Sequence, residues 1–205
     1  LKNKFMRVVT ILIAVVSMNT FNLGQGTEKE IIAFFQKQIS IPQEYQSKEV
    51  KKVDVDNKQA YLFRYEKNNS NGIGGEHFSF LVTKDKPYTI LGFTRMDVSY
   101  SVNQYLSREE TEKIARDFLE KIDPDLNRDL TNLWIEPHDE EITIGNKTVK
   151  VKGMKYKCYR KKKEDYAWVI VGSDGSVVTF ERDILWDNEK HERITNKWLH
   201  DNWLN

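Results

Sequence analysis

The feature that most constrains the fold of this chain is a helix-start pattern that occurs twice. Thr27 and Glu30 form one Ser/Thr-x-x-Glu capping box, and Ser107 and Glu110 form another. In such a box the hydroxyl accepts a hydrogen bond from the third helical residue, while the glutamate accepts one from the capping residue. Apolar residues at helical spacing follow both boxes, so the sequence predicts two amphipathic helices that begin after Thr27 and after Ser107.

Alternating apolar and polar residues follow each helix and predict antiparallel strands. The clearest runs are 61–65 and 78–82 in the first half and 154–158, 166–171 and 177–182 in the second. Both halves close on the same pattern, Phe93-Thr94-Arg95 and Phe180-Glu181-Arg182, and Gly145-Asn146 predicts the turn of an additional hairpin in the second half. The shared order predicts an α+β fold of two repeats, each a helix packed on an antiparallel sheet. Chance similarity of two α+β segments is the alternative.

This interpretation divides the chain into five segments. They are an N-terminal signal peptide or anchor (1–26), a first repeat (27–97), a linker (98–106), a second repeat (107–184) and a C-terminal helix (185–205). The last helix is predicted because Ile194, Trp198 and Leu199 lie at i, i+4 and i+5. We expect this apolar stripe to dock on the sheet of the same chain.

The N-terminal segment indicates export. Lys2, Lys4 and Arg7 precede an apolar run over 8–18, which is the pattern of a secretory signal. A retained N-terminal anchor is the alternative to cleavage. We therefore expect the protein to be secreted or extracytoplasmic.

Cys158 is the only cysteine, so the chain cannot form an internal disulfide. Its alternation with Tyr156 places the thiol in the core.

The second helix and its strands resemble a known family. The residues that carry the resemblance are Leu106-Ser107-Arg108-Glu109-Glu110, Phe118-Leu119, Ile122-Asp123-Pro124, Asp174-Gly175 and Phe180-Glu181-Arg182. They are similar to the PepSY-like repeats of exported Gram-positive proteins, in particular the YcdB/YcdC type, best over 106–183 and more weakly over 27–97. The resemblance implies a small extracytoplasmic α+β module that restrains proteases or takes part in envelope processes. It assigns no functional residue.

Candidate chemistry in the sequence is sparse. Oxygen ligands alternate over Asp123–Asp129 as in a calcium loop, but Arg128 stands where the tight turn requires glycine, so a turn or short helix is the better interpretation. His138, Glu140 and Glu141 could serve an envelope hydrolase if another acid converged on them. They lie in an acidic run, 138–141, for which a solvated loop is the default expectation. We therefore predict no catalytic residue, no metal and no cofactor.

The densest basic segment is the candidate binding surface. It comprises Lys155, Lys157, Arg160, Lys161, Lys162 and Lys163. A solvated hairpin is the alternative, because exposed charges also protect strand edges. The balance of 32 Lys and Arg against 31 Asp and Glu argues against a nucleic-acid partner. The sequence thus predicts a non-catalytic binding module whose partner is an extracytoplasmic protein or peptide, an anionic wall polymer or a membrane surface; a purely structural envelope protein is the further alternative.

Overall fold

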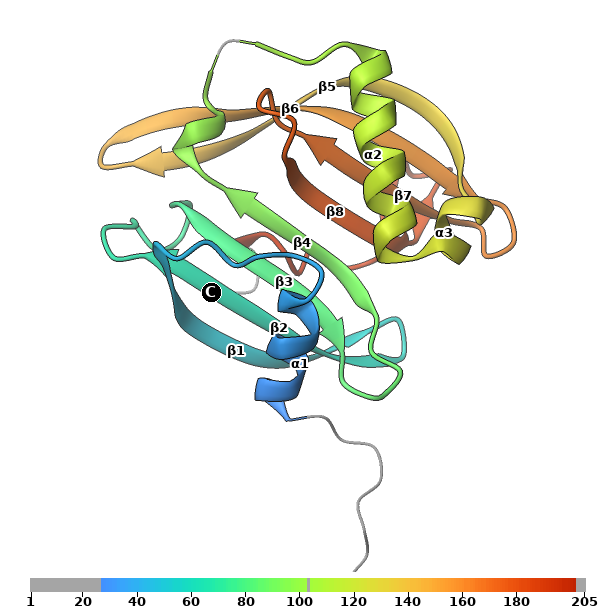
Figure 1. The fold of residues 1–205 in the computed structure, drawn as a ribbon, viewed down its shortest axis with the longest axis horizontal. Helices are drawn as coiled ribbons and strands as arrows, with labels where there is room; N and C mark the ends of the chain where they lie inside the picture. Colours follow the sequence, from blue (N-terminus) through green and yellow to red (C-terminus); the bar gives the residue numbers. More distant parts are fainter. Residues whose placement is uncertain (1–26, 103, 202–205) are drawn as a thin grey trace, which may run out of the picture.

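One antiparallel sheet dominates the computed structural model, which describes residues 27–102 and 104–201 (Figure 1). Its strands are Tyr45–Val55 (β1), Lys58–Lys67 (β2), His77–Thr83 (β3), Ile90–Met96 (β4), Thr131–Ile144 (β5), Lys147–Arg160 (β6), Asp165–Val171 (β7) and Val177–Ile184 (β8). They pair in the order β1-β2-β3-β4-β8-β7-β6-β5. The later strands thus join in reverse chain order, and β4 meets β8 in the middle of the sheet. The predicted signal or anchor, 1–26, lies outside the described residues.

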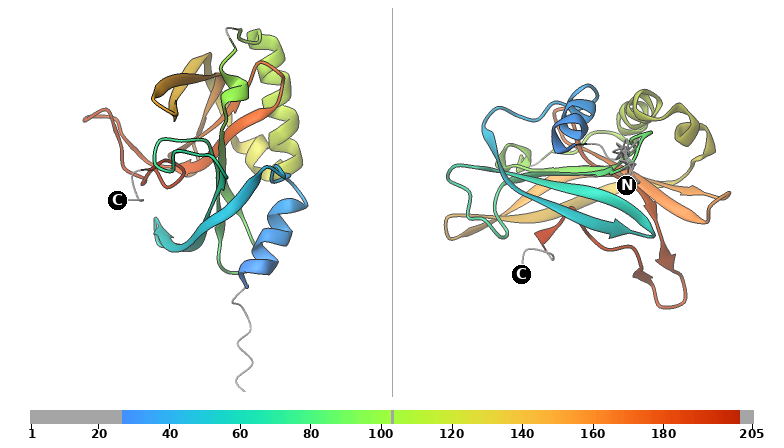
Figure 2. Two further views of the ribbon diagram at one scale, coloured as in Figure 1. Left: turned by 90° about the vertical axis from the view of Figure 1, so that its left-hand side faces the viewer. Right: turned by 90° about the horizontal axis from the view of Figure 1, so that it is seen from below.

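The α-helices that the structure describes cover one face of this sheet. They are α1 (Glu28–Gln36), α2 (Arg108–Ile122) and α3 (Pro124–Asp129), and the 3₁₀ turn η1 (Val98–Tyr100) lies between β4 and α2 along the chain. Figure 2 shows α1 over the β1–β4 half and α2 with α3 over the other half, with the C-terminal segment on the opposite face. Both predicted capping boxes are confirmed: the side chains of Thr27 and Ser107 accept from the backbone at Glu30 and Glu110, and the two glutamates bond back.

The predicted fold class, two repeats that each pack a helix on a sheet of their own, is wrong. The eight strands form a single sheet, and one apolar core runs under both helices. Within it Phe35 of α1 stacks on Phe80, and Phe93 of β4 lies 6.0 Å from Phe118 of α2. Phe118 in turn lies 5.3 Å from Phe180 of β8, measured between ring centroids. The aromatic residues therefore link the two halves into one unit.

The junction between β4 and β8 explains why the halves merge. Gly92, Phe93 and Thr94 pair with Glu181, Phe180 and Thr179, and the hydroxyls of Thr94 and Thr179 are 2.7 Å apart. Two separate four-stranded sheets would each leave an edge strand with unpaired backbone groups in the middle of the molecule. Joining them satisfies these groups and removes two edges.

The predicted C-terminal helix is also wrong. The segment after β8 forms a short hairpin of β9 (Trp186–Asp187) and β10 (Glu192–Arg193) and then crosses the helix-free face. The Asp187 carboxylate accepts hydrogen bonds from the backbone N–H groups of Glu189 and Lys190, a local turn that competes with helix formation. Leu199 nevertheless docks on the sheet, as expected for the apolar stripe, and is 2% exposed. Ile194 is 58% exposed.

Two strands differ from the sequence-based expectation. The acidic run 138–141, predicted to be a solvated loop, lies inside β5 and pairs with residues 150–153 of β6. No strand was predicted over β1, an edge strand rich in charged residues, three of them lysines, whose exposed positions lack regular alternation. Charged side chains on an edge strand prevent aggregation and at the same time hide the strand from hydrophobic pattern reading.

Candidate functional site

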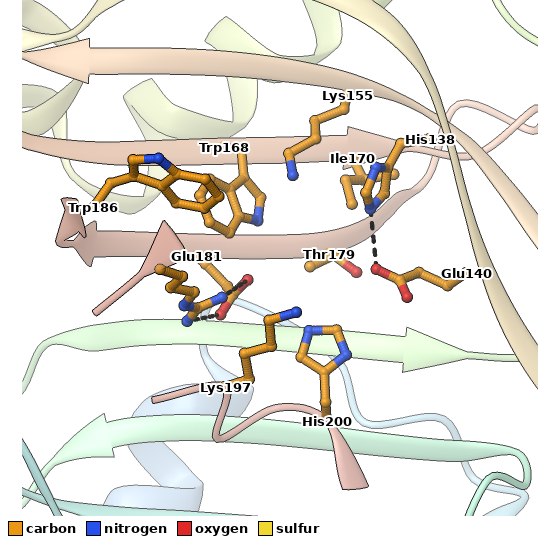
Figure 3. A pocket seen from close by; sticks show the side chains of 11 residues that line it. His138, Glu140, Lys155, Trp168, Ile170, Thr179, Glu181, Trp186, Lys197 and His200 are labelled. Carbon is orange, nitrogen blue, oxygen red and sulfur yellow. Dashed lines mark hydrogen bonds and ion pairs between the residues drawn. The ribbon is translucent and has the colours of Figure 1, made fainter. Parts of the chain in front are cut away.

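A cleft opens on the helix-free face, between the strands β5–β8 and the C-terminal segment that crosses them (Figure 3). It encloses about 290 Å³. Its lining residues are His138 and Glu140 of β5, Lys155 of β6, Trp168 and Ile170 of β7, Thr179 and Glu181 of β8, Trp186 of β9, Arg193 of β10, and Lys197 and His200 beyond it. Four strands of the sheet and the C-terminal segment thus contribute to one site.

The floor of the cleft is an indole flanked by cations. Trp168 is 6% exposed, and Lys155 Nζ lies 4.1 Å from its ring centroid. The guanidinium carbon of Arg193 lies 5.4 Å from the same ring. Arg193 also donates to both carboxylate oxygens of Glu181, at 2.7 and 3.1 Å. This buried bidentate pair neutralises its own charges and fixes the β10 segment against β8.

A histidine and a carboxylate lie together at the β5 side of the cleft. His138 Nε2 is 3.0 Å from Glu140 Oε1, and Figure 3 shows this pair facing the cleft. Burial raises the pKa of Glu140, but the hydrogen bond from His138 and the proximity of His200 outweigh it, so the pKa lies below its ordinary value. Glu140 is therefore a carboxylate at neutral pH, able to accept hydrogen bonds but not to donate a proton.

The opposite wall comes from the C-terminal segment. Figure 3 shows the side chains of Lys197 and His200 turned toward the space that Lys155 and His138 face. Leu199 anchors this segment beside Gly92, where an added Cβ would lie 3.0 Å from Leu199 Cδ1 and 2.6 Å from the backbone oxygen of Phe180. The absence of a side chain at Gly92 therefore lets the segment approach the sheet closely.

Lys155 is the half-buried lysine of the cleft. Burial lowers the pKa of its ammonium to about 8, with Lys157 and Arg193 acting in the same direction and Glu181 and Glu140 against it. Within the described part of the chain, no carboxylate lies within ion-pair distance of Lys155 Nζ. The three cations Lys155, Arg193 and Lys197 outnumber the two carboxylates Glu140 and Glu181 in the lining, so the cleft has a net positive character.

The predicted basic surface is distributed over different places. Lys155 lines the cleft, and Lys157 is half-buried among aromatic rings next to it. Arg160 is buried and donates to Asp165 and to Asp183, the latter at 2.6 Å, so it is a structural cation that no ligand can reach. Lys161, Lys162 and Lys163 lie exposed in the turn after β6, where Lys162 pairs with Asp129.

The residues of the hydrolase alternative are partly brought together. His138 and Glu140 line the cleft together with a further acid, Glu181. Strand alternation turns Glu141 to the other side, where it is exposed. Of the three predicted residues, two therefore share a concave site.

The remaining candidate groups have structural roles. Asp123 caps α3 by accepting from the Leu126 N–H and pairs with Arg182, as expected for the end of one helix and the start of the next. Cys158 is confirmed as a core thiol, and burial raises its pKa to about 11. Among residues 27–102 and 104–201 no group of three or more His, Cys, Asp or Glu side chains could hold a metal ion. None of the helices described combines the length and hydropathy that a membrane crossing requires.

Sequence reasoning missed the aromatic residues and the C-terminal cations of the cleft. Trp168 was expected only as part of the strand over 166–171. Trp186, Arg193, Lys197 and His200 fell in the segment 185–205, which was expected to be helical. The only available signal was the alternation of β7, which puts Trp168 on the face opposite to Val169. Their convergence depends on pairing between distant segments.

Compared with protein-family models, with curated proteins and with solved structures, the chain gives no match to any of the three. The resemblance to PepSY-like repeats and the expected export therefore stay predictions.

Proposed function

We propose that this protein is a non-catalytic binding module that holds an anionic, ring-bearing ligand in the cleft. The observation that carries the proposal is the Lys155 ammonium, which lies over Trp168 without a carboxylate partner among the described residues and opposite Lys197. An anionic group of the ligand would supply the missing partner. Charge-assisted hydrogen bonds of this kind are about twice as strong as neutral ones.

The rest of the lining fits a ligand with both apolar and hydroxyl character. Trp186 presents a half-buried ring at the rim, on which a flat ligand face can pack. Glu140 remains ionised and can accept hydrogen bonds from ligand hydroxyl groups. A sugar that carries a carboxylate or phosphate combines these properties. The sequence-based expectation of a protease or another envelope protein as the partner stays a prediction, because no described feature of the cleft selects a polypeptide.

Calorimetric titration with glucuronate, glucose 6-phosphate and glucose tests this function. We expect the two anionic sugars to bind and the neutral one to bind at least about tenfold more weakly, because a hydrogen bond to a charged group contributes about 1.5–3 kcal/mol. Lys155→Met should remove this preference. Lys113→Met, at an exposed position on α2, is the matched control and should bind like the unaltered protein. Equal affinity for glucuronate and glucose would rule out the proposal.

The pH dependence of binding provides a second prediction. Lys155 has a pKa of about 8, so its positive charge is present at pH 7 and is lost as the pH rises above that value. Affinity for glucuronate should therefore fall between about pH 7 and about pH 9. Lys155→Arg keeps its charge throughout this range and should flatten the profile. A decline of the same size in the arginine variant would show that another group controls binding.

A hydrolase is the second candidate function, and the pairing of His138 with Glu140 favours it. If His138 Nε2 donates to Glu140, its Nδ1 is left as a proton acceptor that could activate a water molecule. Under our proposal, a panel of chromogenic ester, peptide and glycoside substrates should show no turnover above that of a His138→Asn variant. Turnover that His138→Asn and Glu140→Gln both abolish, while glucuronate binding persists, would establish the hydrolase instead.

A further inference from the structure

A second group of aromatic rings lies directly beside the cleft and surrounds Lys157. Its ammonium is 5.4 Å from the ring centroid of Trp134, 4.9 Å from that of Tyr166 and 5.2 Å from that of Trp186. We call these three rings and Lys157 the aromatic cage. All four side chains are half-buried. Cation–π attraction keeps the ammonium among the rings while leaving parts of both accessible at the surface.

The aromatic cage is continuous with the cleft. Trp186 lines the cleft and also faces Lys157, so the two sites share a wall. Lys155 and Lys157 are two positions apart on β6, which puts both on the same face about 7 Å apart along the strand. On β5, Trp134 pairs with Lys157 and His138 with Gly153, so Trp134, His138 and Glu140 also share this face.

The cleft and the aromatic cage together form a strip along β5 and β6, and this strip is longer than a single sugar ring. Trp134 and Glu140 are six positions apart on β5, which corresponds to about 20 Å along an extended strand. A monosaccharide would occupy the cleft or the aromatic cage but could not reach both ends. A ligand that uses the whole strip must be a chain.

The charges along the strip select the kind of chain. Carboxylates alternate with the cations along the strip. Glu140 and Glu181 line the cleft, and Glu136 occupies the position opposite Lys155 in the register of β5 and β6, without an ion pair between the two side chains. A polymer with a charge on every phosphate and few donors would be repelled by these groups. A polymer that combines carboxylates with many hydroxyl groups can pair with the lysines, donate to the glutamates and pack its ring faces on Trp134 and Trp186.

We propose that the ligand is an acidic glycan chain that spans the cleft and the aromatic cage. The inference rests on the proposed function, because it assigns the ligand class of the same cleft and extends the site to Trp134 and Lys157. The cleft then recognises one acidic sugar unit, and the aromatic cage recognises a neighbouring unit of the same chain.

Binding as a function of chain length tests this inference. The probes are galacturonate and its dimer, tetramer and octamer, with neutral cello-oligosaccharides of equal length as controls. We expect affinity to rise at least about tenfold from the monomer to the tetramer and then to level off. A Trp134→Ala/Lys157→Met variant should lose this gain and keep the affinity of the unaltered protein for the monomer. Leu133→Ala, at the exposed neighbouring position, should lose nothing.

The outcomes separate the two proposals. Monomer binding without a gain for longer chains would overturn the glycan-chain inference and leave the proposed function intact. Absence of binding by every acidic sugar would overturn both. Tighter binding of a single-stranded oligothymidylate than of the uronate octamer would overturn the assignment of a glycan in favour of nucleic acid, which also combines stacking with charge.

Discussion

Replacing Arg64 by methionine is expected to lower the free energy of unfolding by about 3–5 kcal/mol, the usual result of breaking a buried ion pair from one side. The Arg64 side chain is fully buried in β2. It donates to Glu66 at 3.0 Å, to the Gly72 carbonyl at 3.2 Å and to the Asp201 carboxylate. The substitution leaves these acceptors without their donor in a site that water reaches poorly. Chemical denaturation of both proteins measures the difference.

The same substitution should also weaken the cleft. Asp201 follows His200 directly, and its carboxylate joins Arg64 to the backbone N–H of Gly74. Without Arg64 the C-terminal segment loses this attachment, so the wall that carries Lys197 and His200 should move away from the sheet. In the Arg64→Met variant we therefore expect the backbone amides over 194–201 to exchange faster than those of β6 and β7. We also expect this variant to bind glucuronate more weakly than the unaltered protein does.

An exposed arginine provides the matched control for Arg64. Arg128 pairs with Asp125 at the surface of α3, where both side chains are largely exposed. Arg128→Met should change stability by no more than about 1 kcal/mol, as is typical of surface ion pairs. If Arg64→Met and Arg128→Met lowered the free energy of unfolding equally, the buried position of Arg64 would add nothing to the stability that its ion pairs provide.

The helices could be predicted from the sequence because their signals are local. A capping box lies within four consecutive residues, and both boxes form as expected at Thr27 and Ser107. Asp123 and Pro124 were expected to lie in a turn or short helix, and Pro124 occupies the first turn of α3 directly after α2. In each of these places the backbone is determined by its immediate neighbours, so no knowledge of the sheet was needed.

The sheet could be predicted strand by strand but not as a whole. Alternation identified most strands, yet nothing in the two Phe-x-Arg patterns indicated that Phe93 and Phe180 pair with each other across the junction of β4 and β8. Pairing between residues so far apart depends on which edges remain open after both halves have formed. The same reason explains why the C-terminal helix was wrongly predicted. Leu199 is buried because it packs on the sheet surface around Gly92, and helical periodicity has no part in this contact.

The candidate site was accessible to sequence reasoning only in fragments. Lys155 belonged to a recognised basic segment, and His138 with Glu140 to a recognised acidic one. What the sequence could not indicate is that β5 and β6 pair along their length, which places these groups in one cleft with Trp168. The density of charge along the chain also led to the wrong expectation that Arg160 belongs to a binding surface. Its guanidinium is instead buried between two acidic partners, Asp165 on β7 and Asp183 on β8.

Replacing Phe35 by alanine should detach α1 from the sheet and cost about 3–5 kcal/mol of stability, the usual range for a buried phenylalanine. Phe35 is fully buried, and its ring stacks on that of Phe80 with centroids 3.9 Å apart. Helix α1 has nine residues, which is too short for a stable helix without tertiary packing. Its capping box alone should therefore not preserve it, and amides over 28–36 should lose their protection from hydrogen exchange.

Phe34 is the matched control for Phe35, because it is an aromatic residue of the same helix that is less deeply packed. Phe34 is only partly buried and touches Tyr88, with ring centroids 5.4 Å apart. Phe34→Ala removes the same atoms but should leave α1 protected and cost clearly less than Phe35→Ala, because less apolar surface is lost from the core. If both variants lost equal stability while α1 stayed protected, the attachment of α1 through the aromatic core would be disproved. The strands and the cleft on the opposite face should keep their protection in either variant, since α1 contributes no residue to that site.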